Sequence, residues 1–486
     1  MVTVKKLSMA IVGAVISGLC LGVEAAHADD KPLVLPDGVF FSPSLLPTAV
    51  DDTVFITGKY TNGQYAVTDG FAPPREGPSP HRHFLDNEAF YIQEGKAAFH
   101  LGDQTFVGGP GDFVYIPQGK THSWINLETT PDKFLVILDP AQLAGYLQEL
   151  RQGQLRGGEQ GYLEAIVKAA PDYATEVSDS LLFDDFEYKI NEDGSSTAGV
   201  TVRRLGTSKE PASATIVLSD GTAKFGEDYS NTEIPVNFAP EEVTQVVDVP
   251  ISLINDDLSE GNETIKLTLT NPSGDTIIAP LQNKAVLSIV DDNAPPGSDS
   301  TNTQLSAQEL QELYGWPTLQ RSDSQIQSFW LGGGTADVVA TGKDTNDNYS
   351  LFDVLVPAET GLQPYINFGD NGFYILDGSV SFKLDDQTIT LNPGNFLFLP
   401  KDTPYEFGNL ATTSARLALI STPSASVPEP SSWLGMLGLG TYLGASLVLK
   451  RKHKKHKSAN FSKQEKANNV ERNTLGPSPV ASVCEL

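Results

Sequence analysis

One domain-sized segment occurs twice in the sequence, and this repeat limits the possible folds more than any other feature. The stretch TGKYTNGQY at 57–65 returns as TGKDTNDNY at 341–349, which is 284 residues later. The stretch FYI at 90–92 returns at 373–375, one residue closer, so the second copy carries a short deletion. Identities at a fixed separation over this length indicate two copies of one ancestral domain. We therefore expect two domains of the same fold with a different segment between them.

Each copy has the pattern of short β-strands separated by turns. In the first copy, apolar and polar residues alternate at 89–93, 96–101, 113–116, 121–126 and 133–138. The chain has 43 Gly and 32 Pro, which suit turns, and helical patterns are confined to short stretches such as 141–150 and 307–313. These features predict an all-β protein in which each copy is a jelly-roll barrel, and a third strand-rich domain lies between the two barrels.

Residues 1–28 have the composition of a secretory signal peptide. Lys5 and Lys6 precede the apolar run 7–23, and the small residues Ala26 and Ala28 come before the expected cleavage site. This pattern predicts export through the inner membrane. The two cysteines of the chain lie in the signal peptide and near the C-terminus, so we expect no disulfide in the folded domains.

The C-terminal region has the pattern of a membrane segment. Residues 433–449 are uncharged and just long enough to span a bilayer, and basic residues follow at 450–457. With Val-Pro-Glu-Pro at 427–430 in front of it, this region resembles the PEP-CTERM sorting signal. The resemblance implies processing by an exosortase-type enzyme and a final location in the cell envelope, on the surface or outside the cell. A plain C-terminal membrane anchor is the alternative, because the polar tail 458–486 is unusual for such a signal.

The net charge of −28 at pH 7 excludes one class of partner. The signal peptide and the C-terminal region are basic, so the domains between them are more acidic than the whole chain. Such a surface repels the phosphates of a nucleic acid and is compatible with divalent cations. We expect no nucleic-acid partner.

Histidines and a glutamate in the first copy indicate a metal site. His81 and His83 are two residues apart on an expected strand, so their side chains share one face. Glu88 and His122 follow, whereas His100, the fourth histidine of the expected domains, belongs on the surface. Three histidines and one carboxylate leave coordination positions open, as a catalytic ion requires. The set suits Fe, Mn, Cu, Ni, Co or Zn and does not select among them.

These residues give the first copy its resemblance to the cupin superfamily, over about 39–150. The pattern H-x-H-x4-E-x6-G is matched from His81 to Gly95, and G-x5-P-x-G-x2-H-x3-N is matched from Gly111 to Asn126. Arg75 stands where the first pattern is expected to open with glycine. The resemblance implies four metal ligands: His81, His83, Glu88 and His122.

The second copy keeps the scaffold residues of the pattern and loses the ligands. Tyr365, Asn367 and Tyr405 replace the three histidines, and Glu88 corresponds to Asn371 or Gly372, depending on where the deletion falls. We expect this copy to be a packing partner, or a pocket for an uncharged ligand lined by Tyr365 and Tyr405. The presence of one intact site argues against similarity to oxalate decarboxylases, which keep metal ligands in both copies. It favours similarity to quercetinase-like bicupins, proteins with two cupin domains. That resemblance implies that Glu88 is also the catalytic base.

The segment between the copies carries acidic clusters at the ends of expected strands, and clustered carboxylates are typical Ca²⁺ ligands. DGTA at 220–223, GEDY at 226–229, NDD at 255–257 and DD at 291–292 make it similar to the Calx-beta domain. Solvated acidic loops are the alternative to a Ca²⁺ site. The resemblance implies the following candidate Ca²⁺ ligands: Glu192, Asp228, Asp256, Asp257, Glu260, Glu263, Asp291 and Asp292.

The expected domain order is: signal peptide 1–28, N-terminal cupin domain with closing helices 29–178, Calx-beta-like domain 179–293, linker 294–303, degenerate C-terminal cupin domain 304–425, sorting signal 427–457 and polar tail 458–486. The first functional hypothesis is an exported metal-dependent dioxygenase that acts on a small phenolic or enol-type molecule. The second is a non-catalytic surface or extracellular-matrix binding protein with a spacer domain stiffened by Ca²⁺.

Overall fold

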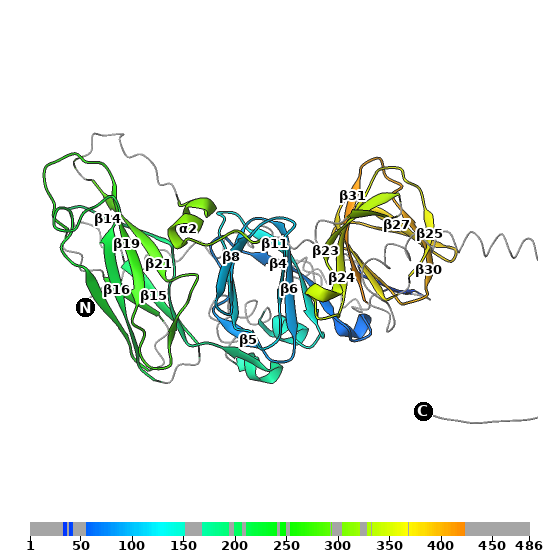
Figure 1. The fold of residues 1–486 in the computed structure, drawn as a ribbon, viewed down its shortest axis with the longest axis horizontal. Coiled ribbons are helices and arrows are strands. Elements are labelled where there is room, and N and C mark those ends of the chain that lie inside the picture. The colour runs from blue at the N-terminus through cyan, green and yellow to red at the C-terminus, as the bar shows by residue number, and fades with distance from the viewer. Residues whose placement is uncertain are drawn as a thin grey trace, which may run out of the picture.

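The computed structural model describes residues 33–35, 38–41, 55–150, 168–193, 199–206, 210–240, 244–248, 253–291, 293, 304–320, 328–331, 333–367 and 369–422. These residues form three β-domains in a row, with the two copies of the repeat side by side and the inserted domain at one end (Figure 1). No helix in the described part of the chain is long and apolar enough to cross a membrane. The expected signal peptide and the expected membrane helix 433–449 lie outside the described residues.

The first barrel consists of two facing antiparallel sheets of five strands each. One sheet has the order β3 (Phe55–Ile56), β4 (Ala66–Ala72), β11 (Asp132–Asp139), β6 (Asn87–Glu94) and β9 (Phe113–Ile116). The other has the order β12 (Thr175–Val177), β5 (His81–His83), β10 (His122–Asn126), β7 (Ala97–Leu101) and β8 (Gln104–Gly108). Apolar side chains from both sheets fill the interior, among them Phe90, Phe99 and Phe134. The alternation that predicted these strands reflects the side chains that point into the barrel.

The second barrel repeats this arrangement and has a longer sheet. The longer sheet has the order β1 (Leu33–Leu35), β2 (Gly38–Phe41), β29 (Phe396–Leu399), β26 (Asn371–Asp377), β31 (Ala415–Ser421), β24 (Ser350–Val356), β23 (Gly334–Ala340) and β22 (Ser328–Leu331). The facing sheet has the order β25 (Gln363–Ile366), β30 (Pro404–Gly408), β27 (Val380–Leu384) and β28 (Gln387–Leu391).

Two strands from the N-terminal part of the chain belong to the second barrel. The expected N-terminal domain 29–178 includes β1 and β2, yet β2 pairs with β29, with Val39 opposite Phe398. The physical reason is that an edge strand such as β29 has unpaired backbone groups, and another strand can satisfy them. The two halves of the chain are therefore interlocked by backbone pairing as well as by packing.

The barrels meet through their β4-containing and β24-containing sheets. Buried residues of both, including Tyr65 and Leu135 from the first and Tyr349 and Phe396 from the second, form one continuous apolar cluster. Among the hydrogen bonds that cross the interface, two form a reciprocal pair: Tyr91 donates to Asp353, and Tyr374 donates to Asp69. These pairs occupy equivalent positions in the repeat, so the interface has the symmetry of a dimer of one domain with itself.

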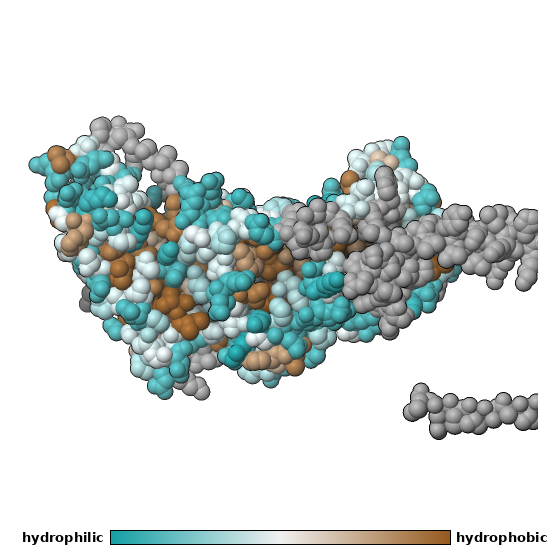
Figure 2. Space-filling view, in the orientation of Figure 1, coloured by the Kyte–Doolittle hydropathy of each residue, from teal (hydrophilic) through white to brown (hydrophobic). Residues whose placement is uncertain are grey.

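The inserted domain is a β-sandwich with a buried apolar core. One sheet has the order β18 (Thr244–Asp248), β15 (Gly199–Leu205), β13 (Ser180–Phe183) and β20 (Ile277–Ile278). The other has the order β14 (Glu187–Asn191), β21 (Lys284–Val290), β19 (Glu263–Thr270), β16 (Ala212–Asp220) and β17 (Glu233–Phe238). The surface is apolar in places over the sandwich and the first barrel, whereas the outer tip of the sandwich is mostly hydrophilic (Figure 2).

Helix α2 (Ala307–Tyr314) packs where the sandwich meets the first barrel (Figure 1). The sequence assigned it to the start of the C-terminal cupin domain, 304–425. Instead, Leu310 and the following Trp316 lie in a buried cluster with Ile125 of the first barrel and with Phe186 and Leu281 of the sandwich. The helix is amphipathic, and its apolar side is buried at this three-way contact, which explains its placement.

Candidate metal centre

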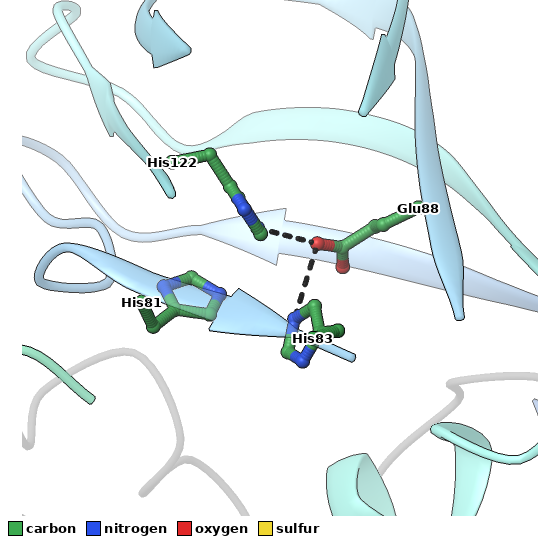
Figure 3. Close-up of side chains that lie close together, drawn as sticks. All are labelled: His81, His83, Glu88 and His122. Atoms are coloured by element: carbon green, nitrogen blue, oxygen red, sulfur yellow. Dashed lines mark hydrogen bonds and ion pairs between the residues drawn. The ribbon is translucent and has the colours of Figure 1, made fainter. Parts of the chain in front are cut away.

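All four predicted ligands of the first barrel come together inside it. His81 and His122 are direct cross-strand neighbours on β5 and β10, and His83 lies two residues further along β5 on the same face. Glu88 reaches the histidines from β6 in the facing sheet (Figure 3). The potential ligand atoms of the four side chains all lie within 4.8 Å of one another.

Glu88 occupies the centre of the group. Its Oε2 is 3.1 Å from His122 Nε2 and 3.7 Å from His83 Nε2. Three of the four residues are almost inaccessible to solvent, at 4% for His83, 6% for Glu88 and 1% for His122, whereas His81 is partly exposed. The group is therefore shielded from water on most sides, with His81 on the accessible side.

The outer nitrogens of the three imidazoles all have hydrogen-bond partners. His81 Nδ1 lies 2.8 Å from the carbonyl oxygen of Ser79, and His122 Nδ1 lies 3.0 Å from that of Lys120. A carbonyl oxygen can only accept, so both Nδ1 atoms carry the proton and both Nε2 atoms keep a lone pair. His83 Nδ1 is held differently, at 2.9 Å from the hydroxyl of Thr175.

Electrostatics favour a neutral imidazole at His81 and an ionised carboxylate at Glu88. Burial, together with the neighbouring His122 and His83, lowers the pKa of His81 well below its usual value. Burial would raise the pKa of Glu88, but its contacts with the side chains of His122 and His83 outweigh burial and leave that pKa below its usual value. A divalent transition metal requires electron-pair donors and a negative charge that converge in one place. These four side chains provide both in a nearly dry interior. The residues present fit such an ion.

The second barrel shows the same frame with different side chains. Tyr365 and Tyr405 are direct cross-strand neighbours, as His81 and His122 are in the first barrel. Asn371 lies opposite Leu399 and Ser421 on the two neighbouring strands. These two residues are the counterparts of the cross-strand partners of Glu88, so Asn371 rather than Gly372 takes the place of the glutamate. Tyr405 packs among buried aromatic side chains. Four neutral residues thus occupy the four ligand positions.

Known protein families account for all three domains and for the C-terminal region. The cupin domain family matches residues 71–138 and again 354–421, and the Calx-beta domain family matches 176–293. The chain carries two cupin domains around a Calx-beta domain. The PEP-CTERM protein-sorting motif matches residues 426–452, which indicates export, exosortase processing and sorting to the envelope. We call the two barrels the N-terminal and C-terminal cupin domains from here on.

Two curated proteins are similar to part of the chain. Quercetin 2,3-dioxygenase of Bacillus subtilis is 28% identical over 126 residues, which is 24% of this chain and 36% of that protein. An uncharacterized protein of Methanocaldococcus jannaschii is 26% identical over 105 residues, which is 22% of this chain and 76% of that protein. The chain thus matches just over a third of the dioxygenase.

Solved structures with low sequence identity also align with the chain. A putative glyoxylate-induced protein of Pseudomonas aeruginosa aligns with a TM-score of 0.39 at 10% identity, covering 83% of this chain and 96% of that one. A point mutant of the oxalate decarboxylase of Bacillus subtilis aligns with a TM-score of 0.37 at 14% identity, covering 84% of this chain and 83% of that one.

Several residues near the candidate metal centre of the N-terminal cupin domain carried no signal in the sequence. Thr175 contacts His83 from 92 positions further along the chain, outside both cupin patterns. The ring of Tyr146 lies 6.4 Å from that of His83. Asp86, two residues before Glu88, accepts the backbone N–H of Gln142 and so anchors the segment that carries Tyr146. A pattern of local spacing cannot reveal such contacts, because the fold alone creates them.

Two other predicted positions have structural roles. His100 is half-buried rather than fully on the surface, and its Nδ1 lies 2.9 Å from the Thr105 hydroxyl, apart from the four-residue group. Arg75 has a φ of 63°, the left-handed conformation that glycine adopts readily. Its guanidinium donates to the carbonyl oxygens of Leu127 and Leu305 and lies over the ring of Phe186. This explains an arginine at the glycine position, since it ties the cupin domain to the Calx-beta domain.

The Calx-beta domain gathers most of its predicted Ca²⁺ ligands at one place. A small pocket is lined by Glu192, Asp228, Glu260, Glu263 and Asp291. Asp228, Glu260 and Glu263 each offer an oxygen within 4.8 Å of the others. Asp256 and Asp257 are not among the lining residues, and Asp292 lies outside the described residues.

The carboxylates of this pocket repel one another. Partial burial, together with the charges of Asp228, Glu260 and Glu192, raises the pKa of Glu263 to about 7. The backbone N–H groups of Glu260 and Gly261 both donate to Asp291, which fixes one carboxylate at the edge of the pocket.

Proposed function

We propose that the protein is an exported metal-dependent dioxygenase whose active site is the centre formed by His81, His83, Glu88 and His122. The observation that carries the proposal is the convergence of these four side chains, with Nδ1 of each imidazole engaged elsewhere, inside an otherwise apolar barrel. Four protein donors would close a tetrahedral site, whereas an ion that takes five or six ligands would keep room for a substrate beside them.

The chain's own residues would share the work as follows. The Nε2 atoms of the three histidines and the carboxylate of Glu88 would hold a divalent ion. Such an ion supplies Lewis acidity, which stabilises the negative charge of a phenolate or enolate oxygen. Glu88, ionised because its pKa is low, would accept the proton that the substrate hydroxyl gives up. A depressed pKa makes it a weak base, so proton transfer depends on stabilisation of the resulting anion.

The walls of the barrel favour a small, largely apolar substrate. Phe90 and Phe134 are fully buried inside it, and Tyr146 closes the side next to His83. An apolar interior excludes water and strengthens the electrostatic interactions at the centre. The similarity to quercetin 2,3-dioxygenase supports a phenolic or enol-type substrate, although the match spans only 36% of that protein.

An oxygen-consumption assay tests the proposal. Purified protein is loaded in turn with Fe²⁺, Mn²⁺, Ni²⁺, Co²⁺ or Cu²⁺ and mixed with flavonols and other enolisable phenols under air. We expect O₂ uptake with at least one metal, together with incorporation of both oxygen atoms into the product when ¹⁸O₂ is supplied. Absence of uptake with every metal would refute the dioxygenase, even if metal binding itself were intact.

The acidic pocket of the Calx-beta domain favours a second candidate function. We propose that its five carboxylates bind Ca²⁺, so that the domain acts as a Ca²⁺-stiffened spacer in a surface or extracellular-matrix binding protein. This role does not require turnover in the cupin domain. A binding assay distinguishes this role from the dioxygenase. Here, binding of a ligand or polysaccharide should persist without the transition metal and be lost without Ca²⁺.

Glu263 gives this proposal a defined pH dependence. Its pKa is about 7 in the folded protein and near the usual glutamate value when unfolded, so the folded state holds an extra proton between roughly pH 4.3 and 7. Without Ca²⁺, the stability of the domain should therefore fall as pH rises through this window. Added Ca²⁺ should raise the melting temperature most above pH 7 and have little effect below pH 5.

The measurement is a set of melting curves from pH 4.5 to 8, with Ca²⁺ and with a chelator. Glu263→Gln should flatten the dependence on pH in the chelator series and weaken the Ca²⁺ effect. Glu233→Gln, a control at an exposed glutamate outside the pocket, should leave both unchanged. Identical curves with and without Ca²⁺ at pH 8 would exclude a Ca²⁺ site in this domain.

A further inference from the structure

His83 is held by a different kind of group from the other two histidines of the metal centre. His81 and His122 each contact the backbone carbonyl two residues before them, at Ser79 and Lys120. Their orientation is therefore set by their own strands. His83 contacts the hydroxyl of Thr175, which belongs to a separate strand, β12, 92 positions away.

A hydroxyl can donate or accept, so Thr175 alone would not determine which nitrogen of His83 carries the proton. The next contact does so. Thr175 Oγ1 lies 3.4 Å from the carbonyl oxygen of Tyr173, which can only accept. The hydroxyl proton is thus directed to Tyr173, and Thr175 Oγ1 accepts from His83 Nδ1. The relay leaves the lone pair of His83 on Nε2, the atom that faces Glu88 at 3.7 Å.

Strand β12 is built to present this hydroxyl. It pairs with β5 in register, with Thr175 opposite His83 and Val177 opposite His81. Thr175 is 6% exposed, whereas the side chain of Glu176 is 51% exposed and forms an ion pair with Arg82 on the outside. The alternation places the threonine toward the centre and the glutamate toward solvent.

The Calx-beta domain fixes the other end of β12. Ser178 donates to the carbonyl oxygen of Pro80, and Asp179 forms an ion pair with Arg204 at 2.7 Å. Arg204 is almost fully buried in the sandwich. The first strand of the sandwich, β13, begins at Ser180, directly after Asp179. The strand that supports His83 therefore runs directly into the inserted domain.

The C-terminal cupin domain provides an internal comparison. There β25 corresponds to β5, and in the described part of the chain β25 is the edge of its sheet, with no strand at the place of β12. The residue at the position of His83 is Asn367, whose amide donates to backbone carbonyls of its own domain, including Leu399 and Pro400. The supporting strand accompanies the copy that has the metal ligands.

We propose that Thr175 is a positioning residue of the metal centre, and that β12 makes the geometry of His83 depend on how the Calx-beta domain is docked. The proposal rests on the metal centre of the proposed function. It assigns to the inserted domain a role in metal binding that is independent of any Ca²⁺ bound within that domain.

The test compares Thr175→Val, Thr175→Ser and Glu176→Gln with the wild type in the full folded chain. Co²⁺ is the probe, and its affinity is measured by competition with a chelator while its visible absorption spectrum reports the coordination geometry. Loss of an outer hydrogen bond to a metal-bound histidine typically weakens binding about 10- to 100-fold, so we expect this loss and an altered spectrum for Thr175→Val. Thr175→Ser, which retains the hydroxyl, should restore both, and Glu176→Gln should match the wild type.

The outcomes separate this inference from the proposed function. A wild type that binds no Co²⁺ at the centre would refute the metal centre itself. Wild-type binding with an unchanged Thr175→Val affinity and spectrum would overturn the role of Thr175. Equal weakening by Thr175→Val and Thr175→Ser would also overturn it, because the hydroxyl would then not be the group that matters. Melting temperatures of the apoproteins distinguish a general loss of stability from a local change in the metal centre.

Discussion

Replacing His122 by alanine is expected to weaken transition-metal binding by at least about 100-fold and to abolish any metal-dependent turnover. The reason is that His122 is the most buried of the four residues and its Nε2 approaches Glu88 most closely, at 3.1 Å. Loss of an outer partner of a ligand already costs about 10- to 100-fold in affinity, and loss of a ligand removes a bond to the ion directly. Chelator competition measures the affinity, and O₂ uptake measures turnover.

His100→Ala is the matched control for this change. His100 lies on β7, the neighbouring strand of β10, but its ring contacts Thr105 and is not part of the four-residue group. We expect His100→Ala to bind metal as the wild type does. If both variants kept full affinity, the metal would be bound elsewhere; if His122→Ala kept full turnover, the activity would not depend on this centre.

Phe396→Ala is expected to lower the free energy of unfolding by about 3–5 kcal/mol, the usual cost of removing a fully buried phenylalanine side chain. Phe396 is fully buried in the apolar cluster that both cupin domains share, and its strand, β29, also pairs with β2 from the N-terminal part of the chain. The loss should therefore affect both domains together. Urea denaturation measures the change, and hydrogen exchange should show faster opening of β11 as well as β31.

Leu410→Ala provides the control, since Leu410 is 55% exposed in the C-terminal cupin domain. Substitutions at exposed positions usually change stability by no more than about 0.5 kcal/mol. If Phe396→Ala accelerated exchange only in the C-terminal domain, the two cupin domains would be independent folding units. The shared cluster would then be a contact surface and not a common core.

The four candidate metal ligands could be brought together from the sequence because their spacing is local. His81 and His83 share a strand face, and the remaining two ligands fall within recognisable patterns of turns and strands. The repeat likewise predicted two equivalent barrels, and the structure assigns Asn371 to the position of Glu88, which sequence spacing alone left open.

Contacts between distant parts of the chain could not be predicted in this way. Three contacts join segments that share no motif: β2 pairs with β29, α2 packs against Ile125, and Thr175 contacts His83. Arg75 illustrates the difference. The sequence showed only that it replaces an expected glycine, whereas the structure shows that its guanidinium bridges two domains.

We propose that the chain holds one transition metal, in the N-terminal cupin domain, and none at the equivalent place in the C-terminal one. Anomalous X-ray scattering from crystals of metal-loaded protein, recorded on both sides of the metal's absorption edge, tests this most directly. We predict a single strong peak between His81, His83, Glu88 and His122, and no peak beside Tyr365 and Tyr405. A peak of similar height in the C-terminal domain, or none among the four predicted ligands, would show that the metal is not confined to this centre or not bound there.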